Sequence, residues 1–226
     1  MKPGIVPDAP TDDAYDPTCR RCPRLAHFLD EVHVRHPDYW CKPVPPYGEA
    51  KARFVIVGLA PGMHGANATG RPFTGDYAGI LLYETLHAYG FASSPHSRTR
   101  ADPLTLVDCR ITNAVKCLPP DNKPVPAEIK TCNTYLTADL KALPAGAAIM
   151  ALGRIAHDAT LRALELRAGD FRFAHGAQHT LSNGRAMFDS YHCSRYNTNT
   201  RRLTARMFRD VFDAVADHLG TPKPVS

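Results

Sequence analysis

The chain has 226 residues, 44% of them hydrophobic and 22% charged, with a formal net charge of +5. These values suit one soluble globular domain and exclude an intrinsically disordered chain. No stretch approaches the roughly 18 to 20 apolar residues of a membrane span, and the Pro- and Asp-rich start lacks the apolar core of a secretory signal. Seven cysteines in a protein that we expect in the cytoplasm favour reduced thiols or a metal site over a disulfide framework.

The positive charge is unevenly distributed. Residues 1–17 contain one lysine and four aspartates, a charge of −3, so residues 18–226 carry +8. Basic clusters attract nucleic acids through counterion release, although a solvated helix face gives the same pattern. DNA is therefore one candidate partner on charge alone. The densest basic stretch contains Arg195, Arg201, Arg202, Arg206 and Arg209.

Four apolar runs predict the strands of a parallel sheet: 53–59, 106–115, 147–152 and 186–191. The first and third are continuous rather than alternating, as in strands that are buried on both faces. Apolar residues at helical spacing predict helices after Pro23, after Pro126 and from Leu203 to Leu219. Strands that alternate with helices predict an α/β fold, a three-layer α/β/α sandwich.

One domain is expected over residues 18–220. We expect a flexible N-terminal segment over residues 1–17 and a flexible tail over residues 221–226, because neither contains a periodic apolar pattern.

Four cysteines form two pairs. Cys19 and Cys22 make a C-x-x-C just ahead of the first predicted helix, whereas Cys117 and Cys132 are separated by a Pro-rich loop and part of a helix. Four thiolates can hold zinc or a [4Fe–4S] cluster. Unrelated buried thiols are the third interpretation, and spacing alone does not choose among the three.

The loop after the first predicted strand reads GLAPGMHGANATGRPFTGDYAG, from Gly58 to Gly79. Its glycines let the backbone approach a ligand closely, but it matches neither phosphate-binding pattern, GxxxxGK[ST] or GxGxxG. Phe73 lies outside any apolar periodicity, so its ring either stacks on a planar ligand such as a base or anchors the loop in the core. Asp76 either caps the next helix or activates water, and these roles are compatible.

Two other strand ends carry polar side chains. Asn113 ends the second predicted strand, and its amide offers a donor and an acceptor that suit the edge of a pyrimidine. His192 follows the fourth strand, where an imidazole can donate a hydrogen bond to developing negative charge. Open α/β sheets bind ligands at such ends, although each side chain could equally be a satisfied structural group.

Together these segments resemble a family 5 (UDGb-type) uracil-DNA glycosylase. The matching motifs are CRRC, the long first loop, TNAVKCLPP with a later cysteine, and HCSRYN, which span residues 19 to about 200. The resemblance implies a central four-stranded parallel sheet and a [4Fe–4S] cluster rather than zinc. We expect a monomer, although the sequence does not determine the oligomeric state. The implied cluster ligands are Cys19, Cys22, Cys117 and Cys132.

The resemblance also implies roles for individual residues. Asp76 matches an aspartate that assists the hydrolytic water, Asn113 an amide that reads the base edge, and His192 a histidine near uracil O2. The expected substrate-binding residues are Phe73, Ala60, Pro61, Gly62, Met63 and Asn197. The expected DNA contacts are Arg195, Tyr196 and Arg201.

Three positions bear on the choice of family. Ala60 favours family 5, because family 4 has GEAPG in the corresponding loop. Ala68 stands where the family pattern has arginine, and Cys193 stands where it more often has proline. The first departure removes a possible DNA contact, and the second makes the rigidity of the His192 loop an open question.

The expected function is that of a monofunctional DNA glycosylase in base-excision repair. It would hydrolyse the N-glycosidic bond of uracil and, given the space at Ala60, of other deaminated bases such as hypoxanthine and xanthine. The main alternative is a non-catalytic Fe–S module that binds damaged DNA. An Fe–S electron-transfer protein and a zinc-stabilised hydrolase are further alternatives.

Overall fold

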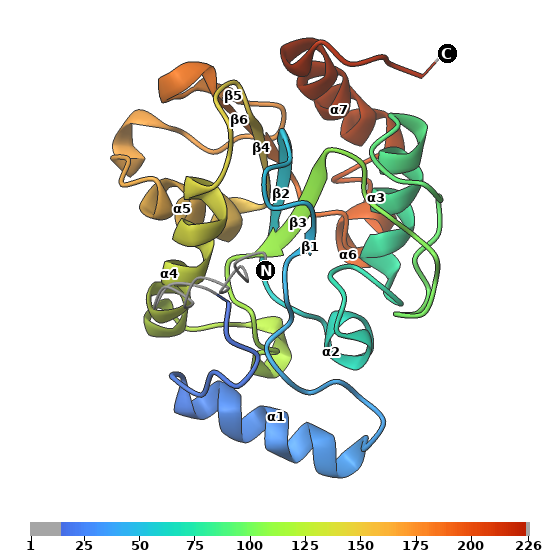
Figure 1. Cartoon of the computed structure of the whole chain (residues 1–226), viewed down its shortest axis with the longest axis vertical. Helices are drawn as coiled ribbons and strands as arrows, with labels where there is room; N and C mark the ends of the chain where they lie inside the picture. Colours follow the sequence, from blue (N-terminus) through green and yellow to red (C-terminus); the bar gives the residue numbers. More distant parts are fainter. Residues whose placement is uncertain (1–14, 225–226) are drawn as a thin grey trace, which may run out of the picture.

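A computed structural model describes residues 15–224 and centres on one six-stranded sheet with the order β1-β3-β2-β4-β6-β5 (Figure 1). The strands are β1 (Tyr47–Gly48), β2 (Phe54–Gly58), β3 (Cys109–Asn113), β4 (Ala148–Leu152), β5 (Gln178–Thr180) and β6 (Ala186–Ser190). The α-helices are α1 (Pro23–Arg35), α2 (Ala66–Thr69), α3 (Tyr77–Ala88), α4 (Pro126–Lys141), α5 (Arg154–Ala163), α6 (Arg195–Asn199) and α7 (Ala205–Leu219).

The four inner strands are parallel, and they coincide with the four predicted runs. β2 pairs with β3 and β4, and β4 pairs with β6, all in parallel register. The two edge strands, β1 and β5, are antiparallel to their neighbours. The sheet therefore has six strands rather than the expected four. β1 has two residues and β5 three, of which two are exposed, so neither produces an apolar run in the sequence.

Helices cover both faces of the sheet, which confirms the predicted three layers. Phe54 and Ile56 of β2 pack in one core with α3 and α7, whereas Val55 and Val57 pack in a second core with α4 and α5. Figure 1 shows these helix pairs on opposite sides of the sheet. Because successive side chains point to opposite faces and both faces are buried, β2 is apolar at every position before Gly58.

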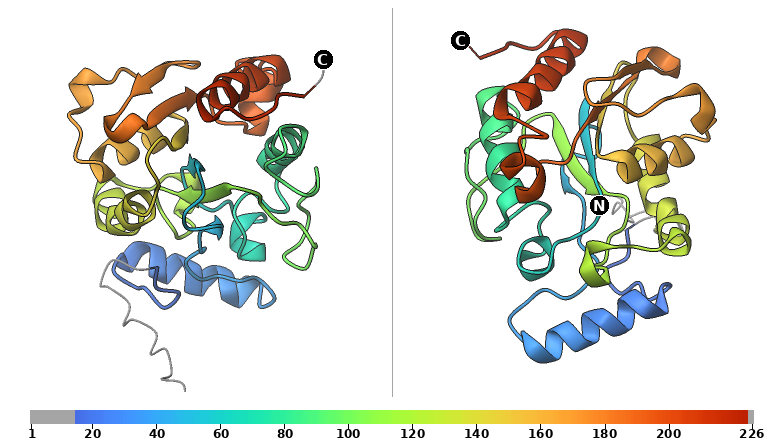
Figure 2. Two further views of the ribbon diagram at one scale, coloured as in Figure 1. Left: turned by 45° about the horizontal axis from the view of Figure 1, so that its top comes forward. Right: turned by 180° about the vertical axis from the view of Figure 1, so that it is seen from behind.

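Helix α1 lies outside the three layers, beyond the ends of β2 and β3 (Figures 1 and 2). Leu29 and Val32 pack against Leu118, which follows β3. Arg24 forms a bidentate ion pair with Glu128 of α4, with both N···O distances 2.8 Å. Pro23 begins the helix, as its position in the sequence predicts.

The C-terminal helix starts two residues later than predicted. Thr204 is the N-cap of α7, and its hydroxyl accepts a hydrogen bond from the Met207 N–H at 3.2 Å. Leu203 therefore precedes the helix, although its side chain is fully buried in the α3–α7 core. Of the two segments predicted to be flexible, residues 1–14 and 225–226 lie outside the described residues. No helix between residues 15 and 224 has the length and apolar character that crossing a membrane requires.

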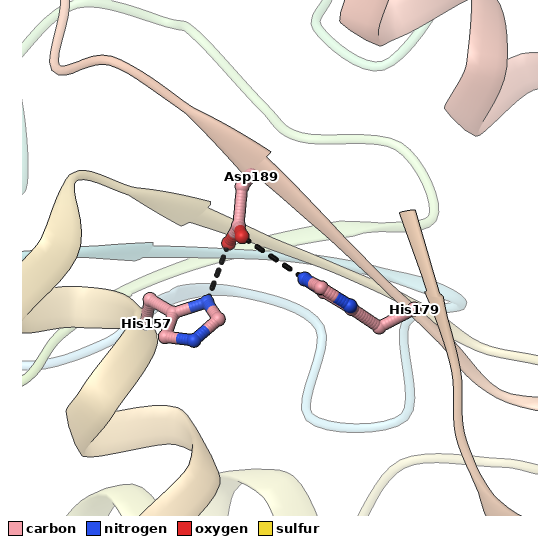
Figure 3. A group of neighbouring side chains, drawn as sticks. All are labelled: His157, His179 and Asp189. Carbon is pink, nitrogen blue, oxygen red and sulfur yellow. Dashed lines mark hydrogen bonds and ion pairs between the residues drawn. The ribbon is translucent and has the colours of Figure 1, made fainter. Parts of the chain in front are cut away.

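A buried carboxylate ties α5 and β5 to β6 (Figure 3). Asp189 accepts hydrogen bonds from His157 Nδ1 at 2.8 Å and from His179 Nε2 at 3.1 Å. His157 Nε2 lies 3.1 Å from the carbonyl oxygen of Phe171. Because a carbonyl and a carboxylate both accept hydrogen bonds, these contacts favour the doubly protonated form of His157. Burial opposes this charge, but Asp189 outweighs it and raises the pKa of His157.

Candidate active site

A cavity of about 350 Å³ opens where β2, β3 and β6 end. Parallel sheets present their carboxyl ends at one edge, and open α/β sheets bind ligands there. Seven of the predicted site residues line the cavity: Ala60, Gly62, Phe73, Asp76, Asn113, His192 and Arg195. The structure thus brings together side chains that are up to 135 residues apart in the sequence (Ala60 to Arg195).

Phe73 forms an aromatic wall of the cavity in a strained backbone conformation. Its φ of +54° lies in the left-handed region, which non-glycine residues rarely adopt. The buried hydroxyl of Tyr83 holds the loop by donating to the Pro72 carbonyl at 2.9 Å. The Phe73 side chain is 6% exposed, and its ring lies 5.8 Å from that of His192 at an interplanar angle of 29°. The ring therefore serves both as a loop anchor and as a surface of the cavity.

Asn113 presents an unpaired amide to the cavity. The side chain is 3% exposed, and its Oδ1 is buried without a hydrogen-bond partner among residues 15–224. A buried polar atom left unpaired costs about 1–3 kcal/mol. Gly58 makes this position possible, because a Cβ there would lie 2.3 Å from Asn113 Oδ1 and 2.9 Å from Phe73 Cζ. The amide is therefore placed to pair with a ligand.

Asp76 has two oxygens with different surroundings. Oδ1 accepts from the Gly79 N–H at 2.9 Å and caps α3, as one of the two sequence interpretations predicts. Oδ2 faces the 62–65 loop, where a Cβ on Gly65 would lie 2.6 Å away. Burial raises the pKa of Asp76, and the hydrogen bonds from Gly79 and Ala78 offset only part of this effect. The carboxylate is thus a stronger base than an exposed one.

His192 is a neutral imidazole at physiological pH, because burial lowers its pKa to about 4. The backbone at His192 is held by Asn197, whose Nδ2 donates a hydrogen bond to the His192 carbonyl oxygen at 2.8 Å. Ser194 caps α6 through the Asn197 N–H at 3.4 Å. Asn197, predicted to bind substrate, therefore holds the loop and lies outside the cavity lining. Cys193 is fully buried in the α3–α7 core.

Only part of the predicted substrate-binding stretch from Ala60 to Met63 lines the cavity. Ala60 and Gly62 line the cavity, whereas Pro61 is buried outside the lining. Met63 packs instead against the cluster of Leu29 on α1. Two of the four residues are consequently in position to contact a ligand.

Basic and aromatic side chains lie at the cavity mouth. The Arg195 guanidinium lies 5.0 Å from the centroid of the Tyr77 ring, and both residues line the cavity. Tyr196 is 72% exposed on α6, and Arg201 is exposed just after it. Neither of these two predicted DNA contacts lines the cavity.

Sequence reasoning missed several lining residues. All but Asn122 lie inside the two motifs quoted above, the Gly58–Gly79 loop and HCSRYN, and could have been found there. Asn122 lies in the Pro-rich loop before α4, with a φ of +57°, and no periodic signal points to it. The lining residues not predicted are Leu59, Ala66, Tyr77, Ala78, Asn122 and Ser194.

The four paired cysteines line a second cavity beside α1. It is walled by Leu25, Val115 and Tyr135. All four cysteines are free thiols, and in the described part of the chain no three of their Sγ atoms lie within 4.8 Å of one another. Cysteine thiolates are ligands of both zinc ions and iron–sulfur clusters, so the chemistry of this donor set suits either group. The members of the set are Cys19, Cys22, Cys117 and Cys132.

A strand-end cavity with a stacking ring, an unpaired amide, a carboxylate and a neutral imidazole defines a protein that can bind and react with a planar heterocycle. A family model described as the uracil DNA glycosylase superfamily matches residues 45–216, and the chain belongs to this superfamily.

Comparison with known proteins narrows the assignment. The type-5 uracil-DNA glycosylase of Thermus thermophilus is 46% identical over 198 residues, which cover 85% of this chain and 90% of the relative. That of Mycobacterium leprae is 40% identical over 220 residues, or 94% and 96%. A type-4 enzyme of Archaeoglobus fulgidus is 36% identical over 140 residues, or 62% and 56%. The chain is a member of the type-5 uracil-DNA glycosylases, which confirms the resemblance of its motifs.

Proposed function

We propose that this protein hydrolyses the N-glycosidic bond of uracil in DNA, and of other deaminated bases with the same hydrogen-bonding edge. The observation that carries the proposal is the unpaired Oδ1 of Asn113 beside the Phe73 ring. Deamination turns the unprotonated ring nitrogen at the base-pairing edge of cytosine or adenine into an N–H next to a carbonyl, in uracil and hypoxanthine respectively. An acceptor in the pocket pairs with that N–H, which xanthine also has, whereas the ring nitrogen of cytosine or adenine presents a lone pair to it.

The base must leave the duplex before it can reach this pocket. Rotation of the nucleotide out of the stack exposes the base, and a mispaired base costs less to extrude. Stacking on Phe73 and pairing with Asn113 compensate for part of that cost.

Bond cleavage leaves the bonding electron pair on the base and positive charge on the sugar. His192 is a neutral imidazole, and its ring N–H donates a hydrogen bond to the carbonyl oxygen of the base that gains negative charge. Asp76 Oδ2 opposes the cationic sugar and takes the proton of the water that attacks C1′. Released base and an abasic site are the products.

Acceptance of purines rests on the space beside Ala60. Ala60 lines the cavity with a side chain of one carbon, and the cavity encloses about 350 Å³. Replacement by asparagine fills part of this space. Ala60→Asn is expected to reduce excision of hypoxanthine and xanthine more than excision of uracil, and equal effects on all three bases argue against this basis for specificity.

Excision from lesion-containing duplexes, detected as strand cleavage after alkali, tests the activity. The wild type is expected to cleave at uracil, and Asn113→Ala to lose most of this cleavage while remaining folded. A non-catalytic module that binds damaged DNA retains affinity for the duplex but produces no alkali-labile site. If the wild type binds the duplex but produces no alkali-labile site, the protein is the non-catalytic module and not a glycosylase.

We also propose that the four cysteines hold a [4Fe–4S] cluster. Support comes from the four free thiols that line one cavity. Burial and neighbouring thiols raise the pKa of Cys22 to about 11, and a cationic group relieves such repulsion among thiolates. The cluster would tether α1 to the segments after β3 and in α4. Monomeric state and cytoplasmic location stay predictions.

A further inference from the structure

A groove of about 530 Å³ adjoins the base pocket. It runs between the start of α3 and residues 95–98, and it shares Asp76, Tyr77 and Arg195 with the pocket. A chain whose one unit occupies the base pocket can therefore continue directly into this groove.

The groove carries unpaired positive charge. Arg98 and Arg195 line it and are exposed, and neither has a carboxylate within 4.0 Å among residues 15–224. The arginines that do have such a partner are Arg20, Arg24, Arg53, Arg71, Arg110 and Arg154. Exposed His96 also lines the groove, and Glu84 on α3 is its acidic residue apart from Asp76. The two arginines equal the two carboxylates in number, but neither arginine is paired with one, so both guanidinium groups can bind an external anion such as a phosphate.

The segment that carries Arg98 is fixed to the catalytic loop. The Gly75 N–H donates to the Ser97 carbonyl at 3.0 Å, and the hydroxyls of Thr74 and Ser97 are 2.7 Å apart. The buried guanidinium of Arg71 donates to Ser97 Oγ at 3.0 Å and also bonds the Thr99 carbonyl. Arg98 is thus held in a fixed place relative to Phe73 and Asp76, which the same loop carries.

Asp102 gives the Arg98 turn its shape. Its carboxylate accepts from the backbone N–H groups of Arg98 at 2.6 Å and Thr99 at 2.9 Å, and these bonds hold its pKa at about 2. The Asp102 carboxylate therefore binds backbone N–H groups of the turn rather than the Arg98 guanidinium, which can bind an external anion.

We infer that this groove binds the backbone of the damaged DNA strand on one side of the flipped nucleotide, with Arg98 on a phosphate. The inference rests on the proposed function, because it extends the path of the same strand. Arg195, at the junction of groove and pocket, contacts the phosphate nearest the flipped base. Ile80, which is 53% exposed in the groove, offers an apolar surface to a deoxyribose.

Binding to a duplex that carries 2′-fluoro-2′-deoxyuridine tests this inference, since the electron-withdrawing fluorine prevents glycosidic cleavage. Arg98→Ala is expected to weaken binding about fivefold at 0.15 M salt and to reduce the slope of log K against log[salt] by about one, the effect of losing one phosphate contact. Arg162→Ala is the matched control, because Arg162 is exposed on α5 at the other face of the sheet. It should change neither quantity.

A neutral methylphosphonate, placed in turn at each of the three linkages on either side of the lesion, identifies the contacted phosphate. At one linkage the Arg98→Ala penalty is expected to vanish, because the partner charge is already gone. A penalty that persists at every linkage, or wild-type affinity and salt slope for Arg98→Ala, overturns the inference. Failure of the proposed function gives a different result, because in that case the wild-type protein releases no uracil.

Discussion

Asp76 caps α3 with Oδ1 and is the proposed base with Oδ2, so its protonation should be measurable in the rate. The proposed base must be ionised, and burial raises its pKa above the ordinary value of 3.8. The single-turnover excision rate is therefore expected to fall on acidification, starting at a pH above that of an exposed carboxylate. A pH series between 4 and 9 measures this fall.

Asp76→Asn provides the control for that profile. Asparagine also caps helices well, so α3 should keep its N-cap while the base is lost. The variant should be slow at every pH and lack the acid limb. An unchanged limb in Asp76→Asn would assign the titration to another group.

His192 gives a second prediction for single residues. Loss of a preorganised donor to a developing anion typically costs about 10²- to 10³-fold in rate, and His192→Ala is expected to show a loss of this size with DNA affinity largely retained. Because the pKa of His192 is about 4, its protonation should leave the wild-type rate unaffected between pH 6 and 8. Stopped assays with saturating enzyme measure both effects, and a wild-type rate in the variant contradicts the assignment.

At the scale of elements, a buried hydroxyl helps to hold the Phe73 loop. Tyr83→Phe removes the hydrogen bond to the Pro72 carbonyl, which keeps only the longer bond from the Thr74 hydroxyl at 3.3 Å. The free energy of unfolding is expected to decrease by about 0.5–1.5 kcal/mol, the net contribution of one hydrogen bond, and uracil excision to slow as Phe73 relaxes. Urea unfolding and single-turnover kinetics measure the two effects. Tyr196→Phe, at an exposed hydroxyl, is the stability control and should unfold like the wild type.

The sequence predicts the elements whose signal is local. Continuous apolar residues identified β2 and β4, and the motifs identified Phe73, Asp76, Asn113 and His192. The edge strands β1 and β5 were not predicted, because they are defined by pairing with a neighbouring strand rather than by burial. Asn122 and Asn197 could not be placed from sequence, since the first depends on how a Pro-rich loop folds and the second on the path of the backbone at His192.

At the scale of the whole molecule, the proposed cluster joins segments that are far apart in the sequence. Cys132→Ser is expected to lower soluble yield, iron and sulfide per folded chain, and visible absorbance together, because metal binding contributes folding free energy. Cys109→Ser is the matched control, at a buried thiol in β3 outside the cysteine cavity. It should lose stability but keep its iron. Full iron content in Cys132→Ser would remove Cys132 from the ligand set.

The buried ion pair between His157 of α5 and Asp189 of β6 predicts a pH-dependent stability. Because the pKa of His157 is raised on folding, its contribution is complete below the unfolded value near 6.5 and is lost as pH rises through the folded value. The difference in unfolding free energy between wild type and His157→Gln should therefore shrink from pH 6 to pH 9. Urea titrations measure it. Exposed His33→Gln should show no such trend, and a constant difference for His157→Gln would contradict the charged pair.

Because glycine has no side chain, Gly58 limits how the sequence of the enzyme can change at this position. A Cβ there would overlap both the amide and the ring that receive the base, so any replacement disturbs recognition whatever its polarity. In a library selected for uracil repair, position 58 should tolerate no substitution, whereas the preceding β2 positions should exchange among apolar residues. Changes in substrate preference would then have to arise at lining positions other than these, such as Ala60.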